Sequence, residues 1–337
     1  MIRRGSRTTA QKGHPFGRRP SGGVADVLWD WSKSGTRHAA RSRLIRRLPG
    51  VGSAAAYRFG LVERPHYAYG VRRATELAAR LGHRGVTVVE FGVAGGNGLL
   101  ALAEHARHYA AATGVAVRVV GFDGGAGMPA ARDPRDLPYL FGPGFYVMDQ
   151  DRLRARLGAA ELVIGDIAET LPDYLDTRAD LLRAHPVGFV GLDLDYYSST
   201  TTALGLFRAP AHEHVLPRVT CYLDDLPGTI EQIGEAAAVA DFNAAHPGRP
   251  IGRVLGLRAF TPFDPPWADQ MYVHHRLDHP DYARLEVGAT GDQLPWTADG
   301  QVSSLRLPTH LPIPGHEAKG SGKAVPETGG NLERTTP

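Results

Sequence analysis

Four aspartates, placed in two pairs, are the residues of this 337-residue chain whose types and spacing best fit a chemical role. Asp193 and Asp195 follow one apolar run, and Asp224 and Asp225 follow the next apolar run along the chain. If both runs are buried parallel strands, their carboxyl ends lie side by side and the acidic side chains converge above one crevice. Like charges gathered there need a counter-ion, and Mg²⁺ would take oxygen ligands from Asp193, Asp224 and Asp225 and acidify a nearby hydroxyl. The same residues also fit a metal-free role as helix caps or ligand contacts.

A glycine-rich segment, EFGVAGGNG at residues 90–98, is the second candidate for a binding role. It places a carboxylate at the end of a predicted strand, then four glycines, then the start of a predicted helix. Glycines allow backbone amides to approach a ligand closely, and a helix N-terminus favours a negatively charged group. The sequence GNGLLA within and after it also fits the G-x-G-x-x-A form of the dinucleotide fingerprint. The segment therefore predicts a cofactor and leaves its identity open, whereas a simple tight turn would explain one or two of the glycines.

Two more aspartates follow the next two predicted strands. Asp123 ends the strand at residues 115–122 and can accept hydrogen bonds from both hydroxyls of a ribose. Asp166, followed by Ile167, ends the strand at residues 161–164. Each has a plainer role, because Asp166 can cap the helix that it precedes and Asp123 can belong to the glycine-rich turn after it. Asp123 nevertheless supports an adenosine ligand without choosing between cofactor families, and an acidic residue ends each of three successive predicted strands.

The elements that position these residues alternate between short β-branched runs and longer stretches rich in alanine and leucine. This alternation is typical of a parallel sheet covered by helices. We predict strands at residues 86–89, 115–122, 161–164, 187–192, 219–223, 252–257 and 270–274. We predict helices at residues 69–81, 99–112, 151–157, 167–184, 200–207 and 230–245, with N-caps at Asn97, Asp166 and Ser198. The expected fold is a Rossmann-like, doubly wound α/β sheet of seven mostly parallel strands with an antiparallel edge strand.

Read from Glu90, the glycine-rich segment resembles the E-x-G-x-x-x-G-x-G motif of class I S-adenosylmethionine (SAM) dependent methyltransferases. The resemblance narrows to the macrocin O-methyltransferase family, which modifies the sugars of macrolides, and it covers residues 90–226. The shared features are a D-x-D-x-Y-x-S-T run from Asp193, the Asp224-Asp225 pair, a segment FDGGAGMP similar to F-D-S-F-x-G-L-P, and ETLP similar to D-T-L-P. The resemblance implies that the methionine end of SAM is held by Glu90, Gly92, Gly95, Gly96 and Gly98, the ribose by Asp123, and the adenine by Asp166 and Ile167. It also implies a metal role for Asp193, Asp224 and Asp225, with Asp195 supporting the loop.

The expected activity is O-methylation of a small hydroxylated acceptor, a sugar or natural product, from SAM with help from Mg²⁺. Asp193 and Tyr196 are the candidate catalytic residues, but the general base is not identified, since His274 and His275 are also candidates. The segment 131–150 departs from the family pattern, and its aromatic residues predict a lid over a different acceptor. A nicotinamide-dependent oxidoreductase is the competing hypothesis, although no lysine lies between Lys33 and Lys319 to form a Tyr-x-x-x-Lys pair. A non-catalytic SAM-binding protein is the third hypothesis.

Composition limits the remaining choices. The formal net charge is +3, and much of the basic excess lies in the first fifty residues, so a nucleic-acid partner is not expected for the core. The single Cys221 rules out an internal disulfide and lies in a predicted strand. No apolar run approaches the roughly 20 residues that span a bilayer. We expect a cytoplasmic protein with a small-molecule acceptor and no membrane partner, and the sequence leaves a homo-oligomer open.

We predict four parts along the chain. An arginine-rich leader at residues 1–24 and a tail at residues 314–337 are too polar to fold and are expected to be disordered. A helical segment is predicted at residues 25–82, and a SAM-binding methyltransferase domain at residues 83–313.

Overall fold

The computed structural model describes residues 56–57, 60–208, 212–226, 230–261 and 265–284. The chain divides into units at residues 1–293 and 294–337, and every described residue belongs to the first unit. The predicted leader at 1–24 and tail at 314–337 lie outside the described residues. Within the described part, no helix is both long enough and apolar enough to cross a membrane.

A seven-stranded sheet in the order β3-β2-β1-β4-β5-β7-β6 forms the centre of the fold. The strands are β1 (Gly85–Phe91), β2 (Ala116–Asp123), β3 (Glu161–Ile164), β4 (Val187–Leu192), β5 (Val215–Leu223), β6 (Ile251–Arg253) and β7 (Met271–His275). The first five pair in parallel, whereas β7 is antiparallel to both of its neighbours. The predicted mostly parallel seven-stranded α/β sheet is confirmed. The reversed strand lies one place in from the edge, because the short β6 pairs with its outer side.

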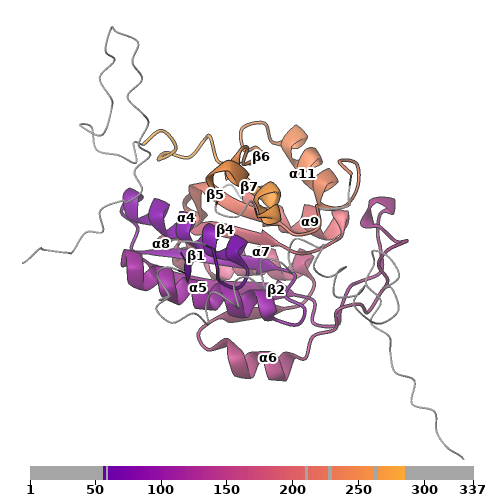
Figure 1. The fold of residues 1–337 in the computed structure, drawn as a ribbon. Helices are drawn as coiled ribbons and strands as arrows, with labels where there is room; N and C mark the ends of the chain where they lie inside the picture. The colour runs from indigo at the N-terminus through magenta and orange to yellow at the C-terminus, as the bar shows by residue number, and fades with distance from the viewer. Residues whose placement is uncertain (1–55, 58–59, 209–211, 227–229, 262–264, 285–337) are drawn as a thin grey trace, which may run out of the picture. The chain divides into compact units, whose positions relative to one another are not determined.

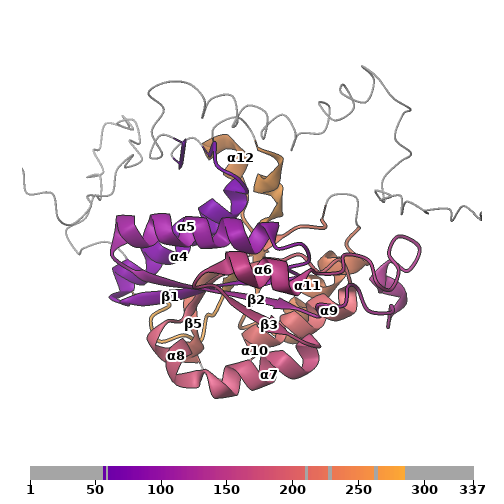
Figure 2. The same ribbon diagram turned by 90° about the horizontal axis from the view of Figure 1, so that it is seen from below.

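Helices cover both faces of the sheet, as Figures 1 and 2 show. One face carries α4 (Pro65–Leu81), α5 (Asn97–Thr113) and α6 (Gln150–Leu157). The other carries α7 (Ile167–Thr177), α8 (Ala179–Ala184), α9 (Tyr197–Ala203), α10 (Gly205–Arg208) and α11 (Gly234–Ala245). Successive residues of β1 serve both layers, since Val88 packs under α4 and α5 whereas Val89 packs toward α7 and α10. All seven residues of β1 are buried, which explains the continuous apolar run in its sequence.

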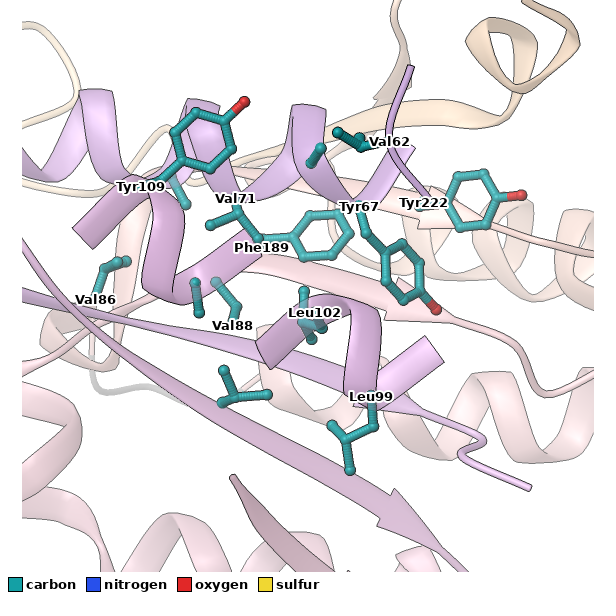
Figure 3. Packing of buried hydrophobic residues seen from close by; sticks show 14 of the residues in the cluster. Val62, Tyr67, Val71, Val86, Val88, Leu99, Leu102, Tyr109, Phe189 and Tyr222 are labelled. Atoms are coloured by element: carbon teal, nitrogen blue, oxygen red, sulfur yellow. The ribbon is translucent and has the colours of Figure 1, made fainter. Parts of the chain in front are cut away.

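The helix before β1 is an integral part of this body. Tyr67 and Val71 of α4 pack with Leu102 of α5 on Phe189 of β4, and Figure 3 shows the cluster. A Cβ at Gly70 would overlap the Phe189 ring, so the glycine lets α4 approach the sheet closely. The helix α4 packs against α5, β1, β4 and β5.

Several predicted element boundaries differ from the structure. The predicted helix at 167–184 is two helices, because Arg178 leaves helical geometry at φ −109° and ψ 15°. The predicted helix at 200–207 is likewise two, and it starts earlier, at Tyr197. The helix predicted at 230–245 begins at Gly234, after the extended Ile233. The strand predicted at 252–257 ends at Arg253, and the four-residue helix α12 (Leu257–Phe260) follows after Gly256, whose φ of 73° no strand can contain.

The predicted helix caps gave a mixed result. Asp166 caps α7, since its carboxylate accepts the N–H of Ala168 at 2.9 Å. Asn97 is wrong as a cap, because α5 already begins there after the left-handed Gly96. Ser198 is also wrong, because α9 begins one residue earlier and its cap position is Tyr196. Cys221 is fully buried in β5, as its apolar neighbours predicted.

Candidate functional site

A cavity of about 550 Å³ lies where the carboxyl ends of the parallel strands meet. Loops after all five parallel strands contribute to its lining. Among the described residues, its lining holds six aspartates and one basic side chain, Arg132; the acidic residues are Asp123, Asp166, Asp193, Asp195, Asp224 and Asp225. The structure thus brings together the carboxylates that follow β2, β3, β4 and β5. Gly92 and Ile167 also line this cavity, whereas Glu90, Gly95, Gly96, Gly98 and Tyr196 do not.

The turn after β1 depends on Gly92. Its φ is 86°, and a Cβ on it would overlap the backbone oxygen of Asp193. The Gly92 N–H donates to the carbonyl of Phe122 on β2, and the Asp193 N–H donates to the carbonyl of Phe91, both at 2.9 Å. A glycine is therefore required for the ends of β2, β1 and β4 to converge at the cavity.

Glu90 is a buried carboxylate beneath the first turn of α5. Its side chain is 1% exposed, and Oε1 accepts the hydroxyl of Tyr67 at 2.7 Å. A Cβ at Gly98 would overlap this carboxylate, so the glycine makes room for it. Within the described residues, Oε2 is buried and accepts no hydrogen bond. Burial raises the pKa of Glu90 to about 7, against the opposing effects of the Tyr67 hydrogen bond and the Arg64 charge.

Asp123 organises the loops on either side of it. Its Oδ2 accepts the N–H groups of Val93 and Ala94 at 2.9 and 2.8 Å, and its Oδ1 accepts that of Gly125 at 2.6 Å. A carboxylate has about four acceptor positions. Three are occupied by backbone amides, and the group still faces the cavity. Asp123 therefore has the predicted role in the glycine-rich turn, and one acceptor position of its carboxylate is left for a ligand hydroxyl.

Asp166 is shared between a helix and the segment that covers the cavity. Besides capping α7, it accepts the guanidinium of Arg132 at 2.9 Å. The Ala168 amide and then Arg132 lower its pKa below the ordinary range. Both residues line the cavity, so this ion pair crosses one side of it.

The predicted lid, residues 131–150, lies mostly in the segment between β2 and α6. Met128 donates to the carbonyl of Phe145 at 2.8 Å, and Gly144 donates to that of Met128 at 2.9 Å. At its base, the fully buried Asp136 accepts the N–H and hydroxyl of Ser198 in α9, at 2.8 and 2.9 Å. Hydrogen bonds thus join parts of this segment to one another and join the segment to α9, the helix that follows β4.

The aromatic residues of the lid have different positions. Tyr146 lines the cavity with a φ of 61°, whereas Tyr139 and Phe145 are 70% and 47% exposed. Phe141 is buried against Tyr196. Burial raises the pKa of Tyr146, and the charges of Asp195, Asp225, Asp193 and Asp224 raise it further.

The candidates for a general base do not reach the cavity. Tyr196 is 1% exposed, and its hydroxyl donates to the Pro129 carbonyl at 3.3 Å, so the structure gives it an anchoring role under the lid. His274 is fully buried and stacks on Phe207 at 4.0 Å between ring centroids. His275 pairs with the hydroxyl of Tyr282 at 2.8 Å.

Asp193, Asp224 and Asp225 form a compact acidic cluster. One carboxylate oxygen from each lies within 4.8 Å of the others. Burial and then the charge of Asp224 raise the pKa of Asp193 well above its ordinary value. Burial and then Asp195 do the same to Asp225, and burial raises the pKa of Asp195 to about 7. Charged carboxylates are therefore costly here without a cation.

Two supporting residues of this cluster were not predicted from the sequence. Tyr222 of β5 donates its hydroxyl to Asp224 at 2.7 Å. Glu235, in the first turn of α11, is fully buried and accepts the N–H groups of Leu194 and Asp225, both at 3.3 Å. The signal for Glu235 was available, since it is an acidic residue directly before the apolar run AAAVA of a predicted helix.

Comparison with known proteins gives similar solved structures. No family model matches the chain, and no curated protein matches it. A structure described as CalS11, calicheamicin methyltransferase, is 20% identical with a TM-score of 0.46, covering 72% of this chain and 93% of that one. The apo structure of CalS11, described as TDP-rhamnose 3'-O-methyltransferase, is 21% identical with a TM-score of 0.41, covering 72% and 94%. A SAM methyltransferase from Silicibacter pomeroyi DSS-3 is 16% identical with a TM-score of 0.26, covering 63% and 94%.

Proposed function

We propose that this chain is a SAM-dependent methyltransferase that methylates a hydroxyl of a small acceptor, a sugar or natural product, with the help of a divalent cation. The observation that carries the proposal is the charge around the cavity. Of the described residues, six aspartates and one arginine line it, and the buried Glu90 lies under the adjoining helix. SAM brings a sulfonium and an ammonium, both positively charged, into these surroundings.

The position of Glu90 favours SAM over a dinucleotide. In a dinucleotide site, the pyrophosphate binds at the helix N-terminus that follows the first strand. Here a carboxylate lies against Gly98 in the first turn of α5, where a second anion would be repelled. The unpaired Oε2 of Glu90 instead suits a ligand ammonium.

The strand ends offer a place for each part of SAM. Glu90 and the turn through Gly92 would hold the methionine end, with Gly95, Gly96 and Gly98 shaping the loop. The free acceptor position of Asp123 suits a ribose hydroxyl, and Asp166 with Ile167 suits the adenine. Because Arg132 occupies one oxygen of Asp166, an adenine amino group would share that carboxylate with the arginine or displace it.

The acidic cluster fits a hard divalent cation. Mg²⁺ binds oxygen ligands at about 2.1 Å, so its ligand atoms are roughly 3 to 4 Å apart. The oxygens of Asp193, Asp224 and Asp225 lie within 4.8 Å of one another, so they need only a small inward movement. A divalent cation held there would supply Lewis-acid chemistry that lowers the pKa of the acceptor hydroxyl.

The residues of the chain would contribute mainly by positioning. Methyl transfer breaks the carbon–sulfur bond of SAM, forms a carbon–oxygen bond to the acceptor and releases the hydroxyl proton. Tyr146 and the lid would exclude water on one side, while Asp193 would orient the acceptor oxygen from the other. Holding two reactants in line is worth several kcal/mol of the barrier, about 7 to 11 in well-oriented cases.

Calorimetric titration tests the proposal. We expect SAM to bind with or without Mg²⁺, and NAD⁺ to give no heat of binding. Binding of NAD⁺ without SAM binding would refute the cofactor assignment. Incorporation of methyl label from SAM into a panel of sugar and polyketide glycosides, with Mg²⁺ or with EDTA, tests the remainder. Equal turnover in EDTA would contradict the cation, and SAM binding without turnover on any acceptor would favour a non-catalytic SAM-binding protein.

A further inference from the structure

We propose that Glu235 is a positioning residue that fixes the distance between Asp193 and the Asp224–Asp225 pair, and so sets the affinity of the site for a divalent cation. This inference rests on the proposed function, because it concerns the cation site. Glu235 belongs to neither the cavity lining nor the three proposed ligands. It lies behind them.

The hydrogen bonds of Glu235 join two separate loops. Its Oε1 accepts the N–H of Leu194, which directly follows Asp193 after β4. Its Oε2 accepts the N–H of Asp225, which directly follows Asp224 after β5. Both distances are 3.3 Å, and the side chain is fully buried. One carboxylate therefore holds the backbone of both ligand-bearing loops at once.

A second hydrogen bond joins the same two loops and also holds them together. The Asp195 N–H donates to Oδ2 of Asp225 at 3.1 Å, so this ligand carboxylate is itself bound by the opposite loop. Asp195 has a φ of 58°, a left-handed conformation that is uncommon for a residue other than glycine. Glu235 accepts the amide just before this residue. The bend that turns Asp193 toward the cluster is thus held by Glu235 and Asp225 together.

The location of Glu235 explains how a buried carboxylate is tolerated there. It is the second residue of α11, a twelve-residue helix, and the N-terminal turn of a helix favours negative charge. Neutral packing would suffice if the residue only filled space, because α11 is otherwise apolar toward the sheet through Ala238 and Phe242. An acceptor with two oxygens is what the two loop amides require. Partners that orient metal ligands in this way typically change metal affinity by about 10- to 100-fold when removed.

The experiment is a Mn²⁺ titration of the full chain, with free Mn²⁺ measured by electron paramagnetic resonance. Glu235→Ala removes both acceptors, Glu235→Gln keeps one, and Glu231→Gln is the matched control at an exposed position four residues earlier. We expect the dissociation constant for Mn²⁺ to rise at least tenfold in Glu235→Ala and by a smaller factor, about threefold or more, in Glu235→Gln. The control should match the wild type. SAM affinity, measured by calorimetry, should stay within twofold in all variants, because the proposed SAM contacts lie on β1, β2 and β3.

The outcomes distinguish a failure of the role of Glu235 from a failure of the proposed function. Wild-type protein that binds no Mn²⁺ would overturn the cation site, and this inference with it, while leaving SAM binding in place. Mn²⁺ binding that is equal in wild type and Glu235→Gln would overturn the role of Glu235 alone. A parallel loss of SAM and Mn²⁺ affinity would show a merely structural role and also overturn it. If Glu235→Ala does not fold, as judged by circular dichroism, Glu235→Gln decides by the same criteria.

Discussion

Replacing Glu90 by glutamine should make the ligand-free protein more stable at high pH and weaken its binding of SAM. Glu90 is buried, and its pKa rises from an ordinary 4.5 to about 7. At about 1.36 kcal/mol per pH unit, ionising it in the folded protein costs about 3 kcal/mol. The folded state binds more protons than the unfolded state between these two values, so this stability is present below pH 4.5 and is lost as the pH rises through about 7. Glutamine does not titrate, and its amide oxygen can still accept the Tyr67 hydroxyl.

The assay is urea unfolding from pH 4.5 to 8 in EDTA, with Glu104→Gln, at an exposed position of α5, as the control. The free energy of unfolding of Glu90→Gln should increase relative to that of the wild type as the pH rises, by about 3 kcal/mol in total. Thermal melts at pH 8 should show a rise of roughly 6 to 12 °C, since 1 kcal/mol is worth about 2–4 °C in a domain of this size. The same variant should bind SAM at least tenfold more weakly, because an ionic partner of the ammonium, worth about 1.5–3 kcal/mol, is lost.

Three results would refute this reasoning. A difference between wild type and Glu90→Gln that does not change with pH would show that Glu90 is not held at a raised pKa. Unchanged SAM affinity at pH 8 would show that its carboxylate does not meet the ligand's positive charge. A gain that Glu104→Gln shares would assign the effect to net charge alone.

Three further predictions concern the turn, the acidic cluster and its pH response. Gly92→Ala should lower the free energy of unfolding by about 3 kcal/mol or more, because Gly92 has a positive φ and an added Cβ would overlap Asp193. Gly95→Ala should lower it by under about 1 kcal/mol, because no described atom lies near the added Cβ. Urea unfolding measures both. Asp224→Asn should leave SAM affinity within twofold by calorimetry but abolish Mn²⁺ binding; retained Mn²⁺ affinity would contradict the ligand assignment. Ligand-free wild type should lose stability from pH 5 to pH 8, because the pKa values of Asp193, Asp195 and Asp225 are raised. Adding 5 mM Mg²⁺ should restore the melting temperature at pH 8, where these carboxylates are charged, but not at pH 5. If the stability of the ligand-free wild type rises with pH in EDTA, raised pKa values of these aspartates are excluded as the cause.

The sequence predicted the sheet well because parallel strands that are buried on both faces have continuous apolar sequences. The continuous apolar runs at β1 and β4 and the acidic residue after each strand were sufficient to place Asp123, Asp193 and Asp224 around one cavity. The predicted helix starts were less accurate, because Gly96 and Ile233 determine where α5 and α11 begin through backbone conformation, which side-chain type only partly encodes.

Contacts between distant segments were the part that the sequence did not show. Tyr196 was a reasonable catalytic candidate by its spacing from Asp193, yet its hydroxyl meets Pro129, 67 positions away. The bonds from Glu235 to Leu194 span 41 positions, and those from Asp136 to Ser198 span 62. Such pairs depend on how loops cross above the sheet, and local periodicity carries no information about them.

The attachment of the lid has a consequence for how acceptor choice can change over evolutionary time. Asp136 and Phe141 of this segment are buried, Phe141 against Tyr196 from the loop after β4, whereas Tyr139, Phe145 and Val147 are exposed. Under the proposed function, substitutions at these exposed positions would alter which molecules are accepted without disturbing the buried residues, the strand ends or the carboxylates below. Under the proposed function, a scaffold of this kind would diversify its acceptors while the carboxylates stay constant, and mutagenesis of Tyr139, Phe145 and Val147, with Phe141 kept, is the natural place to look for new acceptors.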